Sequence, residues 1–152
     1  MMFEILRAEK EHLPGIAALE KLCFAEPWSE SALALYLKEE AVAFAAVDGN
    51  RVLGYIGMLF APDEGQILNL AVLPETRRNG IAKALVAQTI RTAEERALSA
   101  ISLEVRASNE GAIRLYESFG FLTAGVRKGF YRRPVEDALV MLKSLSPAKS
   151  DL

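Results

Sequence analysis

Hydrophobic and polar residues alternate along this chain with two different periods, which predicts a mixture of strands and helices. Short runs rich in β-branched and aromatic residues predict strands, and turn sequences such as Asp48-Gly49-Asn50 separate them. Apolar residues at spacings of three and four predict helices. The expected strands are Phe3–Arg7, Val42–Val47, Arg51–Phe60, Gln66–Leu73, Ala100–Val105, Phe121–Val126 and Asp137–Leu142, and the expected helices are His12–Phe24, Glu30–Glu39, Gly80–Leu98 and Glu110–Phe119.

This order of elements predicts an α/β (α+β) fold in which helices cover the faces of one mixed sheet. The strand, turn, helix and strand around Gly80 should form a right-handed parallel crossover, and the last two strands an antiparallel pair. Ser29 and Ser108 are the expected N-caps of the second and fourth helices. Residues 1–143 are expected to form a single domain, and the polar tail 144–152 is expected to be frayed or disordered.

The longest expected helix is predicted to pack through a stripe of apolar residues at spacings of three and four. A basic turn immediately precedes this helix, after an apolar run that stops at Pro74. A helix start leaves its first backbone amides unpaired, so phosphate binds there readily. Gly80 allows close approach of an anion, and Arg77, Arg78 and Lys83 add positive charge. An ordinary helix start is the alternative interpretation. The residues of the expected stripe are Ala82, Val86, Ile90, Ala93 and Ala97.

Composition narrows the possible functions. The chain has 152 residues, of which 51% are hydrophobic and 25% charged, as in soluble globular proteins. A net charge of −2 gives no case for nucleic acid or an anionic membrane, so a polyanion would be held by local cations. One cysteine and one histidine argue against a disulfide framework and a metal site. Cys23 is expected to be buried and to pack in the apolar core. Without a membrane-length apolar span or signal-peptide pattern, a cytoplasmic location is expected.

Five segments resemble a known family. The residues Arg77-Arg78-Asn79-Gly80-Ile81-Ala82 are similar to the acetyl-CoA signature Gln/Arg-x-x-Gly-x-Gly/Ala of the GCN5-related N-acetyltransferase (GNAT) superfamily. The resemblance implies a mostly antiparallel mixed sheet of about seven strands, about four helices and one splayed parallel strand pair. Four further segments resemble the bacterial RimI-type ribosomal-protein alanine N-acetyltransferases, and these are Phe24–Glu30, Leu68–Val72, Leu103–Phe121 and Phe130–Met141.

The resemblance implies acetyl-CoA as the co-substrate. Amides within Arg78–Lys83 are then expected to bind the pyrophosphate, and the backbone of Leu70–Val72 to pair with the pantetheine arm. Asn109 is expected to hydrogen-bond that arm, with helix capping as the competing explanation. The expected cofactor-binding residues are Leu70, Ala71, Val72, Arg77, Arg78, Asn79, Gly80, Ile81, Ala82, Lys83 and Asn109.

Two residues of the matching segments are the expected catalytic groups. Glu104 alternates with Leu103 and Val105 and so points away from them. A solvated carboxylate or an ion pair with Arg106 would also explain it, whereas the resemblance implies a general base. Tyr116 follows on the next helix, and its phenol could donate a proton to the departing thiolate. The alternative for Tyr116 is an amphipathic-helix tyrosine with a solvated hydroxyl.

The expected reaction is direct attack of a protein N-terminal α-amine on acetyl-CoA, with the N-terminal alanine of a small-subunit ribosomal protein as acceptor. Trp28 and Tyr131 are the expected acceptor-binding residues, although Trp28 could simply cover the core and Tyr131 could be an ordinary strand aromatic. Many family members have two tyrosines where this chain has Phe130-Tyr131. The rival functions are acetylation of a small amine or internal lysine, and non-catalytic acyl-CoA sensing. The oligomeric state does not follow from the sequence.

Overall fold

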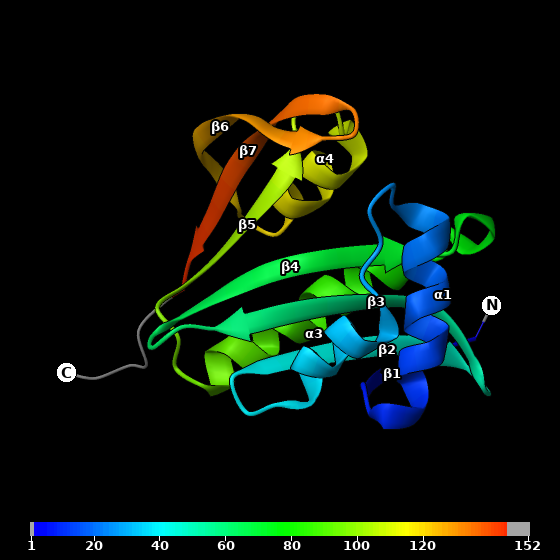
Figure 1. Ribbon diagram of the computed structural model, residues 1–152. Helices are drawn as coiled ribbons and strands as arrows, with labels where there is room; N and C mark the ends of the chain where they lie inside the picture. Colours follow the sequence, from blue (N-terminus) through cyan, green and yellow to red (C-terminus); the bar gives the residue numbers. More distant parts are fainter. Residues whose placement is uncertain (1, 146–152) are drawn as a thin grey trace.

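A single seven-stranded sheet organises the molecule, in the order β1-β2-β3-β4-β5-β7-β6 (Figure 1). The structure is a computed structural model that describes residues 2–145. The expected fold class is confirmed. The strands are β1 Glu4–Arg7, β2 Ala41–Asp48, β3 Arg51–Phe60, β4 Glu64–Val72, β5 Ala100–Arg106, β6 Leu122–Arg132 and β7 Val135–Ser144. The α-helices are α1 Leu13–Cys23, α2 Glu30–Leu33, α3 Ile81–Glu95 and α4 Glu110–Ser118.

The only parallel pair among the described strands, β4 and β5, separates along its length. Residues 64–67 of β4 pair with residues 100–103 of β5, and no pairing follows beyond Ile67 and Leu103. Toward β3, Asn69 pairs with Gly57 while Ile67 pairs with Met58, so Leu68 is the extra residue of a β-bulge. Figure 1 shows the resulting opening between β4 and β5. The other strand pairs are antiparallel.

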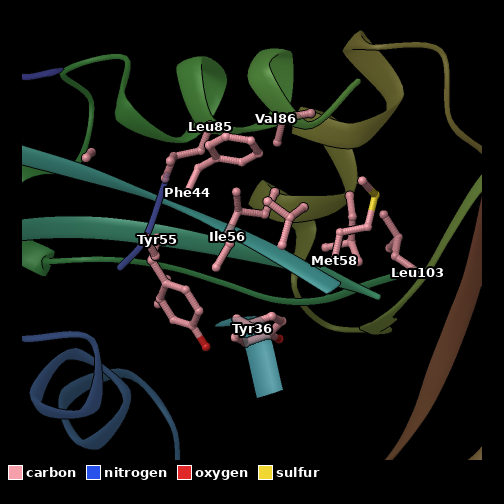
Figure 2. Packing of buried hydrophobic residues seen from close by; sticks show 14 of the residues in the cluster. Tyr36, Phe44, Tyr55, Ile56, Met58, Leu85, Val86 and Leu103 are labelled. Atoms are coloured by element: carbon pink, nitrogen blue, oxygen red, sulfur yellow. The ribbon is translucent and has the colours of Figure 1, made fainter. Parts of the chain in front are cut away.

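Helices cover both faces of the first four strands. In Figure 2, Leu85 and Val86 of α3 pack on one face with Phe44, whereas Tyr36 and Tyr55 lie on the face covered by α1. The expected stripe of α3 is partly wrong, because α3 ends at Glu95 and Ala97 is exposed. The fully buried residues of this helix are Ile81, Leu85, Val86, Thr89 and Ala93.

Tertiary contacts change three local expectations. The helix expected over Glu30–Glu39 is a short α2, which Ser29 caps as expected, followed by the 3-10 helix η2 over Ala34–Leu37. This 3-10 turn carries Tyr36, which is buried against the backbone of Gly57, so packing overrides the helical pattern.

At the start of α4 the N-cap is Asn109, not Ser108, because the Asn109 side chain accepts a hydrogen bond from the Ala112 amide at 3.1 Å. The Ser108 amide instead donates to Glu136 at 2.6 Å.

The last two strands are longer than expected, and β7 extends through Ser144. Ser144 is thus part of the sheet and Leu145 is buried, so these two residues of the expected tail belong to the domain. The rest of that tail, residues 146–152, lies outside the described residues. No helix within residues 2–145 is long and apolar enough to cross a membrane.

Candidate active site

Two adjoining cavities lie where β4 and β5 separate. The first, of about 560 Å³, lies between the two strands and is bounded by the loop after α1 and by β6. The second, of about 700 Å³, lies between the end of β4, the start of α3 and α4. They form a continuous groove, because five residues line both: Cys23, Phe24, Leu70, Asn109 and Ala112.

The start of α3 presents unpaired amides to the second cavity. Gly80 is the N-cap, with a left-handed φ of 81°, and Arg78 also has a left-handed φ of 71°. The first helical amide to find a backbone acceptor is that of Ala84, which donates to Gly80 at 3.0 Å. The amides of residues 81–83 have no acceptor among the described residues, so they and the helix dipole favour an anion here.

The side chains of the basic turn divide between the groove and the turn itself. Arg77 lines the second cavity, but its Nε donates to the Val72 carbonyl at 3.2 Å. Arg78 and Lys83 line the same cavity as exposed cations. Asn79 does not line either cavity. Its side-chain Nδ2 donates a hydrogen bond to the Thr76 carbonyl at 2.9 Å, which braces the turn.

The last residues of β4 form one wall of the groove. Leu70 lines both cavities, and Ala71 and Val72 line the second. Beyond Ile67 this strand has no strand partner on the β5 side, so that edge faces the groove. Asn109 lines both cavities at their junction, and its side chain also caps α4.

Glu104 projects from β5 into the first cavity, away from the buried Leu103 and Val105 as expected. Its side chain is only 18% exposed. The alternative interpretation, an ion pair with Arg106, is absent from the described contacts. Instead, Arg127 of β6 reaches across β7 and places its Nε 2.7 Å from Glu104 Oε2. Oε1 has no polar partner among residues 2–145.

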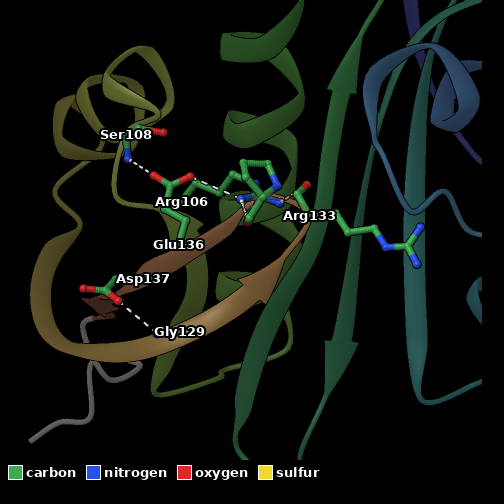
Figure 3. A network of polar contacts seen from close by, with 7 residues as sticks. Arg106, Ser108, Gly129, Arg133, Glu136 and Asp137 are labelled. Atoms are coloured by element: carbon green, nitrogen blue, oxygen red, sulfur yellow. Dashed lines mark hydrogen bonds and ion pairs between the residues drawn. The ribbon is translucent and has the colours of Figure 1, made fainter.

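Arg106 is engaged with the turn between β6 and β7 (Figure 3). It pairs with Glu136 at 3.2 Å and donates to the carbonyls of Arg133 and Pro134, both at 3.0 Å. Hydrogen bonding from Ser108, helped by Arg106, lowers the pKa of Glu136, so this carboxylate stays ionised at neutral pH. These contacts hold the strand end that carries Tyr131 against the cavity.

Tyr116 lines the first cavity from α4 and is 4% exposed, so the expected alternative of a solvated hydroxyl is wrong. Its ring packs edge-on against Phe121, with centroids 5.4 Å apart. The hydroxyl has no hydrogen-bond partner among the described residues. Burial, and secondarily Tyr131, raises the pKa of Tyr116. Burial and then the charge of Glu104 raise the pKa of Tyr131. Glu104, Tyr116 and Tyr131 all line the first cavity.

The loop after α1 forms the opposite side of the first cavity. Trp28 lines this cavity and also stacks on Tyr36, with ring centroids 5.7 Å apart and planes 8° apart, so it both covers the core and faces the groove. Glu26 and Arg133 also line this cavity and form an exposed ion pair, with Glu26 Oε2 3.9 Å from Arg133 Nε. Cys23 packs against the core as expected, but it is only half-buried and also lines both cavities, so the expected burial is partly wrong.

Sequence reasoning missed several residues that line or support the groove, including Cys23, Asn69 and Arg127. A polar Asn69 inside the apolar strand segment LNLAV was the one available signal. Arg127 gave no signal, because its partner lies 23 positions earlier on a strand that is not its neighbour. Within residues 2–145 no cluster of three or more His, Cys, Asp or Glu side chains could hold a metal ion.

Comparison with known proteins identifies the family of this chain. Residues 13–121 match the acetyltransferase (GNAT) family. The chain is 34% identical over 147 residues to the ribosomal protein bS18-alanine N-acetyltransferase of Escherichia coli K12, covering 95% of this chain and 99% of that protein. The crystal structure of the ribosomal-protein-S18-alanine N-acetyltransferase from E. coli superimposes with a TM-score of 0.91 at 34% identity, over 99% of each chain.

A second solved structure, of the NatC complex bound to Gag peptide and CoA, matches with a TM-score of 0.86 at 26% identity, over 96% of this chain and 100% of that chain. The family match spans more than half of the sequence and includes every residue that lines the second cavity. The chain therefore belongs to the acetyltransferase (GNAT) family and is an acetyl-CoA-dependent N-acetyltransferase.

Proposed function

We propose that this protein acetylates the α-amine of a protein N-terminus, with the N-terminal alanine of a small-subunit ribosomal protein as its acceptor. The observation that carries the proposal is the continuous groove, which has unpaired amides in one half and a carboxylate beside a buried phenol in the other. The E. coli relative is named for the alanine of ribosomal protein bS18, and its similarity extends over nearly the whole of both chains.

The donor half of the groove fits coenzyme A. Acetyl-CoA supplies an activated acyl thioester on a long arm that contains amides and ends in a pyrophosphate. The amides of residues 81–83, with Arg78 and Lys83, would hold the pyrophosphate. The free edge at Leu70–Val72 would hydrogen-bond the arm as an added strand does. Asn109, at the junction, would contact the arm near the thioester.

In the acceptor half, we assign Glu104 as the general base and Tyr116 as the general acid. Glu104 Oε1, which Arg127 leaves free, would take the proton of the amine directly or through one water. The amine nitrogen bonds to the acetyl carbon as the carbon–sulfur bond breaks. Tyr116 then gives its proton to the leaving sulfur. Because the raised pKa keeps this phenol protonated, the donor is present at neutral pH.

An α-amine suits a base of this modest strength. Its pKa is near 8, so about a tenth of it is neutral at pH 7, compared with well under a thousandth of a lysine amine. The amine can thus attack in a complex that contains both substrates, without a covalent enzyme intermediate. The matching NatC structure contains a peptide and CoA together. Trp28 and Tyr131, on opposite sides of the first cavity, would contact the peptide N-terminus.

The deciding experiment compares three acceptors in the presence of acetyl-CoA. They are a peptide with N-terminal alanine and one internal lysine, the same peptide formylated on its α-amine, and spermidine. We expect rapid acetylation of the free peptide alone, with the added acetyl group located on the α-amine by fragment mass spectrometry. Faster turnover of the blocked peptide or of spermidine would replace this proposal with the lysine or small-amine function. CoA binding without turnover of any acceptor would indicate a sensor.

A further inference from the structure

A buried carboxylate that is not one of the proposed catalytic groups connects two segments that line the first cavity. Glu20, on α1, is 0% exposed. Its Oε1 accepts a hydrogen bond from the Trp28 amide at 2.8 Å, and its Oε2 accepts from the Tyr55 hydroxyl and from Asn69 Nδ2, the latter at 3.1 Å. No described lysine, arginine or histidine pairs with it. Three hydrogen bonds, rather than a cation, compensate its burial.

Two of these partners lie on different segments of the chain that both line the first cavity. Trp28 lies on the loop after α1, and Asn69 lies on β4 next to Leu68, the extra residue of the bulge against β3. Asn69 also accepts a hydrogen bond from the Tyr36 hydroxyl at 3.2 Å, and the Tyr36 ring stacks on Trp28. Glu20, Trp28, Tyr36 and Asn69 therefore form a closed ring of contacts.

The third partner anchors the ring to the sheet. Figure 2 shows Tyr55 and Tyr36 on the same face, the one covered by α1. Burial, and then the charge of Glu20, raises the pKa of Tyr55, so this hydroxyl keeps its proton and remains a donor. An apolar residue at position 20 would avoid the desolvation cost of a buried carboxylate, but it could not hold three donors from three segments.

We infer that Glu20 is a positioning residue, which holds the acceptor-side loop bearing Trp28 at a set distance from β4, the strand that carries the acyl donor. This inference rests on the proposed function, because the loop is the acceptor side only if a peptide binds there. Displacing this loop would weaken its contacts with the peptide, which raises KM, and would also misalign the two substrates, which slows a direct transfer. Glu20 acts through Trp28 and Asn69 and does not itself line either cavity.

Glu20→Gln tests the inference, because it keeps the shape of the side chain and removes the charge. We expect KM for the alanine peptide to rise roughly tenfold, as for a displaced substrate-positioning group, while Kd for CoA changes less than about twofold. Trp28 is the only tryptophan, so its fluorescence reports the loop without any acceptor. We expect a red-shifted emission maximum and stronger acrylamide quenching in the variant.

Ile16→Ala is the matched control, because Ile16 is a fully buried residue one turn earlier on α1 that makes none of these polar contacts. It should lower Tm but leave KM and Trp28 quenching as in the wild type. If Glu20→Gln lowered Tm alone, like the control, Glu20 would be merely structural and the inference overturned.

Tyr55→Phe provides a second variant, because it removes one donor while keeping Glu20. A smaller change in the same direction supports the inference, and unchanged fluorescence together with unchanged KM contradicts it. If fluorescence changed but the wild type acetylated no peptide, the positioning of the loop would stand while the proposed function failed.

Discussion

Glu104 is the residue on which the proposed proton transfer depends, and one of its two oxygens is already held by Arg127. Replacing it by glutamine removes the base while preserving the shape of the side chain. We expect Glu104→Gln to lower kcat by about 10²-fold, the usual effect of losing a general base, with little change in Kd for CoA. Glu117→Gln, at an exposed position on α4 that lines neither cavity, is the control. A kcat equal to that of the control would remove Glu104 from the mechanism.

Tyr116 combines burial with a hydroxyl that has no partner among the described residues. Such a hydroxyl costs stability, so Tyr116→Phe should leave the free energy of unfolding unchanged or slightly increased. The same change removes the proposed acid, and we expect kcat to fall by about 10²-fold. Urea unfolding and steady-state kinetics on the same samples check both effects. Loss of stability with normal kcat would show that the hydroxyl serves the fold.

The raised pKa of Tyr116 has a definite sign. Burial stabilises the neutral phenol relative to the phenolate, so the proton is retained to higher pH than in an ordinary tyrosine. We expect wild-type kcat to show no fall due to this group up to about pH 10, the ordinary tyrosine value. A pH profile of kcat with the N-terminal alanine peptide measures it, and a fall below about pH 10 that is absent in Tyr116→Phe would show that the pKa of Tyr116 is not raised.

At the scale of the elements, the Tyr36 ring of η2 packs directly against the backbone of β3 at Gly57. A Cβ added at Gly57 would lie 2.1 Å from Cζ of Tyr36, and so would displace the ring that stacks on Trp28. We expect Gly57→Ala to lower the free energy of unfolding by about 1–3 kcal/mol, as for overpacking, and to increase Trp28 quenching. Gly125→Ala is the control, because that strand glycine has open space around its Cβ position. Equal stability of the two variants would show that Tyr36 can move freely.

At the scale of the whole molecule, positive charge gathers at the groove although the chain is slightly negative overall. The net charge is −2, yet Arg78 and Lys83 stand exposed at the groove beside the unpaired amides of α3. Because exposed charges are screened by salt, raising NaCl from about 0.05 to about 0.5 M should increase Kd for CoA severalfold. Lys83→Gln should show a shallower dependence in calorimetric titrations. A Kd independent of salt would mean that the cations contribute little to binding.

Local patterns in the sequence predicted much of the fold and several contacts. The strand over Arg51–Phe60 has the expected ends, the cap by Ser29 is present, and Glu104 projects away from its apolar neighbours. These features depend on residues a few positions apart, whose periodicity or side-chain chemistry decides the backbone conformation. The basic turn and glycine before α3 are likewise a local signal, and they line the second cavity as a group apart from Asn79.

Contacts between distant segments decided the rest. The amino-acid sequence by itself determined the elements, their order and the kind of chemistry available at the groove. Only the tertiary structure decided that Arg127 pairs with Glu104, that Cys23 faces the cavities, and that Glu20 joins its loop to β4. The physical reason is that the Arg127–Glu104 and Asn69–Glu20 contacts join residues 23 and 49 positions apart, and their geometry depends on the bulge and the separation of two strands, which no local period encodes.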